Sequence, residues 1–190
     1  MRLILSLFLA LSVTSIKGFA QEEKILRVGI GQEFDSLNPL NTSMLSAIYI
    51  YNMIGRNMSS LDHNMKWHPQ VVDEVPSFKN KLAEIKTING VKKLVSIWNI
   101  RSSAKWGDGV VTCADFKFTW TVGRSNFVTV VNRDMYTDIE AINCDEKKPK
   151  RVEMIHATIR WDFYKMFQFY ILPKHLEEPV YAKYGQEKEG

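Results

Sequence analysis

Alternation of apolar and polar positions is clearest in two pairs of segments that we expect to form β-hairpins. Residues 84–88 and 91–100 are rich in apolar and β-branched side chains and are separated only by Asn89-Gly90, a dipeptide typical of two-residue hairpin turns. Residues 138–144 and 151–157 form a second such pair, joined by a polar connection that contains a proline. The pattern therefore predicts two antiparallel strand pairs.

A helix is predicted between the two strand pairs. Gly107-Asp108-Gly109 precedes it, and we expect these glycines to supply the positive φ values of a tight turn. Thr112, followed three residues later by Asp115, is typical of a helix N-cap with a carboxylate near the positive end of the dipole. Phe116 and Trp120 then share one face. The helix is expected to pack against the preceding strand and to bury the Trp120 indole between helix and hairpin.

A short strand is predicted at the start of the mature chain, over residues 25–31, where apolar residues and glycines alternate. Leu37-Asn38-Pro39 follows it. Proline disfavours the helical conformation in the residue before it, so this segment is expected to be a loop.

The next helix is expected near residues 44–52, with Thr42 or Ser43 as its cap. Its apolar side chains include Leu45 and Tyr49. Their spacing predicts that this face turns toward the core.

The first 20 residues have the pattern of a secretory signal peptide. Arg2 gives a positive start, residues 3–13 are apolar, and residues 18–20 offer small side chains before a cleavage at Gln21. No cysteine lies near that position, so a lipid anchor is not supported. A membrane-spanning anchor is disfavoured because the apolar run is shorter than the roughly 20 residues needed to cross a bilayer.

Composition adds limits on size and partners. A chain of 190 residues, 45% hydrophobic and 12% aromatic, can build one large domain or two small ones with a packed core. The formal net charge of +4 includes Arg2 and Lys17 of the signal peptide, so charge does not point to nucleic acid. Cys113 and Cys144 are an even pair that could form a disulfide in an exported protein. Their Cα separation cannot be read from the sequence, and two buried free thiols are the favoured expectation.

The sequence gives only weak signals for catalytic or metal-binding residues. His63 and His68 flank Trp67 without a third ligand at suitable spacing, so they are interpreted as solvated loop residues. Lys174 and His175 have no nucleophile or carboxylate partner at motif spacing and are interpreted as the start of a helix. With no phosphate-binding glycine loop either, we expect neither an enzyme nor a cofactor or metal.

Three motifs resemble the extracellular solute-binding proteins of the peptide and nickel importer class, often called family 5. The longest contains Ile100-Arg101, Trp106, Asp108-Gly109, Thr112-Cys113-Ala114-Asp115 and Phe116-Lys117-Phe118-Thr119, and the others are Leu37-Asn38-Pro39 and Leu172-Pro173-Lys174-His175. One departure is Cys113, where the family usually has alanine. A small apolar residue packs similarly there.

The resemblance implies an α/β fold: the N-terminal part of a type II periplasmic-binding-protein-like, two-lobed fold with a β-rich subdomain. The implied organisation is a signal peptide over residues 1–20, the start of lobe I over 21–58, the β-rich subdomain over 59–165, and a return toward lobe I over 166–190. The chain would then end before the second lobe.

The function implied by the resemblance is that of a periplasmic substrate-binding component of an ABC importer for peptides, with a membrane permease as partner. A truncated, non-binding fragment or a partner-binding surface is the alternative. Open α/β sheets bind ligands beyond strand ends, which makes the loop after the first strand the candidate ligand site. Its residues are Glu33, Phe34, Asp35, Ser36 and Asn38. The alternative is that they cap the next helix and brace the turn.

Overall fold

The computed structural model describes residues 25–166 and 168–184, and the expected signal peptide lies outside them. The chain divides into two units, residues 1–31 and 32–190. Residues 25–31 are exposed and carry no strand hydrogen bonding. The strand predicted there is therefore wrong, because alternating apolar residues form a strand only when a neighbouring strand satisfies their backbone groups.

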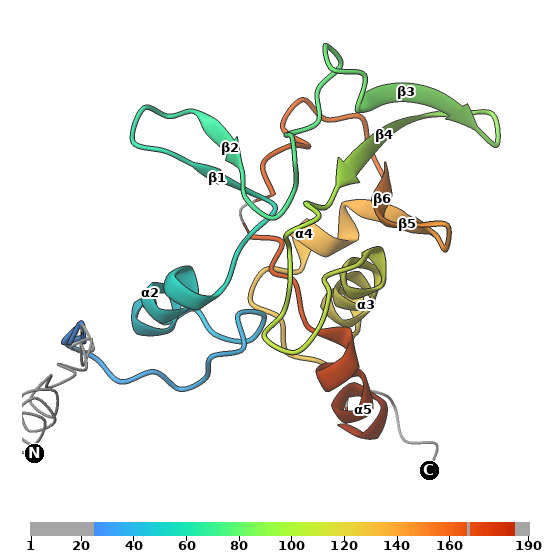
Figure 1. The fold of residues 1–190 in the computed structure, drawn as a ribbon. Helices are drawn as coiled ribbons and strands as arrows, with labels where there is room; N and C mark the ends of the chain where they lie inside the picture. The colour runs from blue at the N-terminus through green and yellow to red at the C-terminus, as the bar shows by residue number, and fades with distance from the viewer. Residues whose placement is uncertain (1–24, 167, 185–190) are drawn as a thin grey trace, which may run out of the picture. The chain divides into compact units, whose positions relative to one another are not determined.

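The second unit contains a two-stranded sheet, a four-stranded sheet and four helices among the described residues (Figure 1). None of the described helices combines the length and apolarity needed to cross a membrane. In chain order the elements are α2 (Leu45–Ile54), β1 (Ser59–Leu61), β2 (Trp67–Pro69), β3 (Ala83–Ile88), β4 (Val91–Asn99), α3 (Cys113–Arg124), α4 (Asp134–Thr137), β5 (Ile139–Asp145), β6 (Lys148–His156) and α5 (Lys174–Tyr184).

The four-stranded sheet has the order β3-β4-β6-β5 and is antiparallel throughout. The first predicted hairpin is confirmed, with Ile88 opposite Val91. Asn89 and Gly90 have φ values of 51° and 79°, the left-handed conformation at both positions that a type I′ turn requires. The second predicted pair is confirmed as β5–β6. Its connection is tighter than expected, because β6 already begins at Lys148.

Helix α3 begins where the sequence predicts. The carboxylate of Asp115 accepts hydrogen bonds from the backbone N–H and the hydroxyl of Thr112, at 2.8 Å and 3.3 Å. The preceding turn differs from the prediction, because Gly90 is the only described glycine with positive φ. Instead, the Trp106 N–H donates to the Gly109 carbonyl at 2.8 Å and closes the turn with ordinary backbone geometry.

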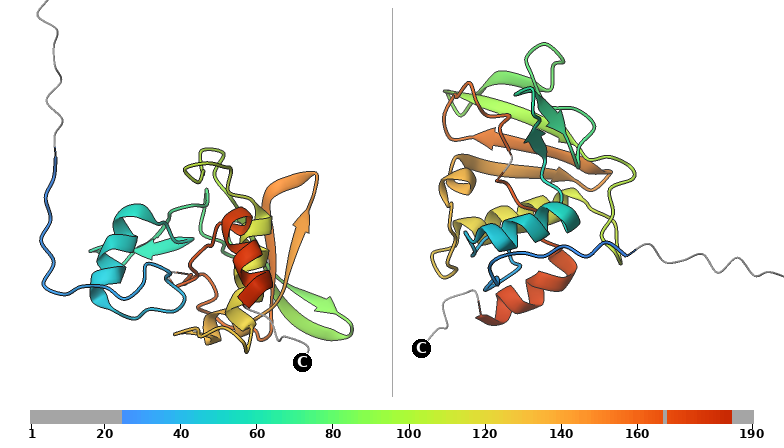
Figure 2. Two further views of the ribbon diagram at one scale, coloured as in Figure 1. Left: turned by 90° about the horizontal axis from the view of Figure 1, so that it is seen from below. Right: turned by 90° about the vertical axis from the view of Figure 1, so that its left-hand side faces the viewer.

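The packing surface of α3 differs from the prediction. The helix packs against β5, β6 and α5 rather than against β4, because the β5–β6 hairpin extends the sheet beyond β4 (Figures 1 and 2). Phe116 is fully buried and stacks with Phe169 at 6.1 Å between ring centroids. Trp120 is only partly buried, and its Nε1 donates to the Ile139 carbonyl at 2.9 Å. Trp120 therefore packs partly buried beside β5, rather than fully buried against the first hairpin.

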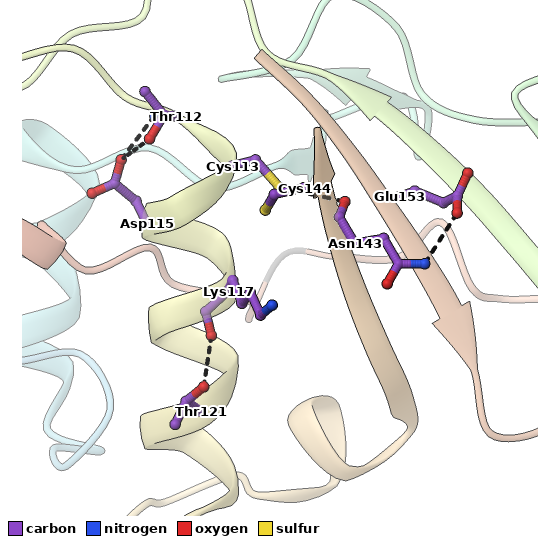
Figure 3. Close-up of a disulfide and its surroundings, with 8 residues drawn as sticks. All are labelled: Thr112, Cys113, Asp115, Lys117, Thr121, Asn143, Cys144 and Glu153. Carbon is purple, nitrogen blue, oxygen red and sulfur yellow. Dashed lines mark hydrogen bonds between the residues drawn. A yellow bond between two sulfur atoms is a disulfide. The ribbon is translucent and has the colours of Figure 1, made fainter. Parts of the chain in front are cut away.

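A disulfide joins the first residue of α3 to β5 (Figure 3). Cys113 is buried, Cys144 is exposed, and their Cα atoms are 5.7 Å apart. The expectation of two buried free thiols is wrong because β5 lies beside the N-terminus of α3, a long-range proximity that the sequence pattern does not reveal.

Helix α2 is confirmed and extends to Ile54, but its cap and orientation differ from the prediction. The residue before the helix is Met44, and no side chain caps the helix. Ser46 and Ala47 form the buried face. Leu45, Tyr49 and Met53, spaced four residues apart, are 60%, 53% and 57% exposed. These three residues form an apolar stripe, here called the α2 stripe, on the side expected to face the core.

Candidate ligand-binding site

The loop predicted to bind ligand is held by its own short hydrogen bonds. The Thr42 hydroxyl donates to Asp35 Oδ1 at 2.7 Å. The Asn38 N–H donates to Ser36 Oγ, and the Leu40 N–H donates to Asn38 Oδ1, both at 3.0 Å. The last two are the side-chain-to-backbone bonds typical of Ser and Asn turns, and the first joins two side chains. The structure therefore places three of the predicted site residues in turn-bracing roles and places none of them at the N-cap of α2.

Each of these polar side chains keeps bonding capacity beyond those bonds. Asp35 uses one carboxylate oxygen, Ser36 still has its hydroxyl proton, and Asn38 still has its amide NH₂. The Glu33 carboxylate has no hydrogen-bond or ion-pair partner among the described residues, while its carbonyl accepts from a serine hydroxyl of α2. Phe34 is 37% exposed. The loop thus presents acceptors, donors and one apolar ring at the surface.

The motif residues of the central stretch connect α3 to the chain segment that precedes α5. Asp115, only 4% exposed, accepts from the Lys174 N–H at 3.0 Å with the carboxylate oxygen not used by Thr112. The Thr119 hydroxyl accepts from the Leu172 N–H at 2.8 Å and donates to the Asp115 carbonyl at 2.8 Å. We call these contacts the α3–α5 bridge. The polar side chains of this bridge stabilise the fold, because they bond to backbone groups of α3 and of the segment before α5.

His175 links the third motif to the Asp-Gly turn. Its Nε2 lies 2.9 Å from Asp108 Oδ1 in the Asp-Gly turn, and both side chains are about half exposed. The interpretation of Lys174 and His175 as a helix start is confirmed, since α5 begins at Lys174. The pair His175–Asp108 fastens this start to the turn before α3.

A buried serine and histidine in the sheet are also structural. The indole N–H of Trp98 donates to Ser96 Oγ at 3.0 Å, and Ser96 Oγ lies 2.8 Å from His156 Nε2. Burial lowers the pKa of His156 from its ordinary 6.5 to about 4, because the charged imidazolium would be desolvated. All three side chains are at most 1% exposed, so no substrate reaches them.

No group of three or more metal-ligating side chains lies among residues 25–166 and 168–184. His68 Nε2 instead lies 2.8 Å from Asp62 Oδ2, and His63 is exposed beside Asn64. Each of these two histidines is therefore accounted for as a surface residue.

A cavity of about 310 Å³ lies beside the predicted loop. Asn38 is the predicted site residue that lines it. Its walls come from α3, α5 and the segment after α3, with residues Asn41, Phe118, Val122, Phe127, Val128, Thr129, Leu172, Glu177, Val180, Tyr181 and Tyr184. A smaller cavity, about 120 Å³, is lined in part by Pro39 and Thr42.

The α5 wall of the larger cavity was not predicted from the sequence. Glu177, Val180, Tyr181 and Tyr184 have the i, i+3, i+4, i+7 spacing of one helical face, which was available as a signal. The helix continues through Pro179, and the partners of this face on α3 and in the segment after α3 are distant in sequence.

Several solved structures resemble this chain, although no family model and no curated protein sequence matches it. The oligopeptide-binding protein from Thermus thermophilus, complexed with a pentapeptide, aligns with a TM-score of 0.63 and 23% identity, covering 77% of this chain and 24% of that one. NikZ from Campylobacter jejuni in complex with Ni(L-His) aligns with a TM-score of 0.60 and 20% identity, covering 77% and 27%. Listeria monocytogenes OppA bound to peptide aligns with a TM-score of 0.60 and 16% identity, covering 80% and 31%.

The similarity to these structures concerns the fold. Identities of 16% to 23% are too low to transfer a ligand, and the chain spans between 24% and 31% of their lengths. The α/β arrangement with antiparallel sheets nevertheless agrees with the fold class expected from the motifs. The chain has part of the two-lobed fold of periplasmic binding proteins.

Proposed function

We propose that the chain serves in the capture of peptides outside the cytoplasmic membrane, as a solute-binding component of an ABC importer. The observation that carries the proposal is the fold similarity over 77% of the chain to an oligopeptide-binding protein with a bound pentapeptide. Proteins of this kind bind and release solutes by shifting a conformational equilibrium rather than by breaking bonds. A membrane permease is the implied partner, and no catalytic role is proposed.

The exposed loop is proposed as one contact surface for the peptide. Glu33 and the free oxygen of Asp35 would attract a ligand ammonium group, while Ser36 and Asn38 would donate to peptide carbonyls. Phe34 would contact an apolar side chain. Because these residues are largely exposed, a ligand on this loop alone stays partly solvated, and we expect a Kd near 1 mM, about −4 kcal/mol.

Isothermal titration with a mixture of di- to pentapeptides tests this function. We expect saturable binding that weakens when Asp35 is replaced by alanine. Glu84→Ala, an exposed carboxylate on β3, is the matched control and should leave binding unchanged. Absence of saturable heat up to several millimolar peptide, with the parent protein folded, would refute the proposal.

Export and domain organisation are parts of the same proposal. We propose residues 21–58 as the start of a first lobe, 59–165 as a β-rich subdomain and 166–190 as the return segment. Protein recovered from the periplasm should begin at Gln21. Recovery of chains that all begin at Met1 would contradict the export step.

A partner-binding surface is the second candidate function, and the α2 stripe favours it. Three large apolar side chains at one helical face, each more than half exposed, are unusual for a surface that contacts only water. Tyr49→Asp together with Met53→Asp would abolish association with the permease if this surface contacts it, while peptide binding by the loop would persist.

A further inference from the structure

The larger cavity has three apolar walls that come from separate parts of the chain. Phe118 and Val122 lie one turn apart on α3 and are each 6% exposed. Tyr181 of α5 meets the Phe118 ring edge-to-face, with 5.9 Å between centroids. Phe127, in the segment after α3, is 56% exposed and forms the third wall. At about 310 Å³, the cavity is large enough for a small organic molecule.

One charged side chain lines this apolar cavity, and it has no partner. Glu177 is partly buried and makes no ion pair or side-chain hydrogen bond among the described residues. The two lysines of α5 contact side chains other than Glu177. Lys174 pairs with Glu178 at 3.1 Å, and the Lys183 ammonium lies 4.8 Å from the centre of the Tyr184 ring.

The position of Glu177 suits a negative charge. It lies in the first turn of α5, where the positive end of the helix dipole favours an anion. A partly buried carboxylate attracts a cation more strongly than a fully solvated one, because less water screens it. Aromatic faces such as that of Tyr181 add a favourable contact for an ammonium group.

We propose that this cavity binds a small amphipathic primary amine. The ammonium would pair with Glu177, and the hydrophobic body would lie against Phe118, Val122 and Tyr181. The amide side chains of Asn38 and Asn41 line the same cavity and can bond a polar substituent of the ligand. The site goes beyond the proposed peptide-binding loop, since it requires none of the carboxylates of that loop.

Titration of the full chain with 2-phenylethylamine, followed by ¹H–¹⁵N chemical shifts, tests the proposal. A ligand of this size in an open cavity should bind with a Kd on the order of 1 mM. Saturating shifts are expected in residues 118–129 and 177–184. The neutral analogue 2-phenylethanol and the anion 3-phenylpropionate should bind at least about 10-fold more weakly, because neither offers a cation to the carboxylate.

Glu177→Gln is the decisive variant, and Glu178→Gln on the same helix is its matched control. The first should weaken amine binding by about 10-fold, and the second should leave it unchanged. Equal binding of 2-phenylethylamine to Glu177→Gln and to the parent, or equal binding of the neutral analogue, would overturn the proposal. Shifts confined to residues 33–38 would also overturn it while leaving the peptide-binding proposal intact. If the parent protein binds the amine but not peptides, the peptide-binding proposal fails and the amine proposal stands.

Discussion

The α3–α5 bridge and the N-terminal segment over residues 33–54 differ in how far along the chain their polar side chains find hydrogen-bond partners. In the bridge, Asp115 and Thr119 are buried and bond to residues more than 50 positions away along the chain. In the N-terminal segment, the side chains of Asp35, Ser36 and Asn38 bond within seven residues of themselves.

This contrast separates motifs that hold the fold from motifs that are free to bind. A buried carboxylate whose two oxygens are satisfied by backbone donors from separate segments cannot be released for a ligand without unfolding its surroundings. A loop with local bonds can exchange them at small cost, because water replaces them readily. The same contrast applies to apolar residues, which are buried on α3 and exposed in the α2 stripe.

The largest expected difference between the two regions comes from deleting an aromatic ring. Phe116→Ala should lower the free energy of unfolding by about 4 kcal/mol, because it leaves a cavity beside Phe169 in the core. Tyr49→Ala in the α2 stripe should cost less than about 1 kcal/mol. Urea unfolding of both variants measures the difference. Equal losses would show that the stripe is packed in solution.

The disulfide gives the next largest effect. Replacing Cys113 and Cys144 together by alanine should cost about 3.5 kcal/mol, since the bond closes a loop with a sequence separation of 31 residues. The same urea measurement on the oxidised parent, with and without reductant, provides the control. If the double variant has the same urea midpoint as the oxidised parent, packing alone holds α3 and β5 together and the prediction is wrong.

The features that were predicted correctly depend on residues that are close together in the sequence. Asn89-Gly90 determines a turn by its own backbone preference, and Thr112 with Asp115 determines a helix start within four residues. The strand at residues 25–31, by contrast, was wrong because a strand depends on a partner elsewhere.

Long-range neighbours explain the other errors. Cys113 meets Cys144 because β5 lies beside α3, and the Trp120 indole bonds to the Ile139 carbonyl of β5 for the same reason. The loop was chosen as a candidate site from its polar residues and stays a prediction. Glu177 was overlooked because its cavity is built from three separated segments.

The bridge can be tested through its central carboxylate. Asp115→Ala should cost about 3 kcal/mol, because the backbone N–H groups of Thr112 and Lys174 lose their acceptor in a buried place. Asp35→Ala is the matched change in the N-terminal segment and should cost less than about 1 kcal/mol, because Asp35 is exposed. Thermal unfolding monitored by circular dichroism can rank the two. A larger loss from Asp35→Ala would reverse the assignment of structural and binding roles.

The smallest of the expected effects is a pH dependence of the free energy of unfolding, which arises from the buried His156 of β6. His156 has its pKa lowered from 6.5 to about 4 by burial, so the folded state keeps it neutral while the unfolded state binds a proton below about pH 6.5. Protonation of the unfolded chain therefore favours unfolding. The stabilising contribution is complete above about pH 6.5, and it is lost progressively as the pH falls toward 4.

At pH 5 this loss should amount to about 2 kcal/mol relative to pH 7.5. Urea unfolding of the parent and of His156→Gln across this range isolates the effect, because the variant has no imidazole to protonate and its stability should fall less steeply. His63→Gln, which removes an exposed imidazole from the turn between β1 and β2, is the control. If the His156→Gln profile is as steep as that of the parent, another group titrates in this range and the buried sheet does not set the acid sensitivity of the protein.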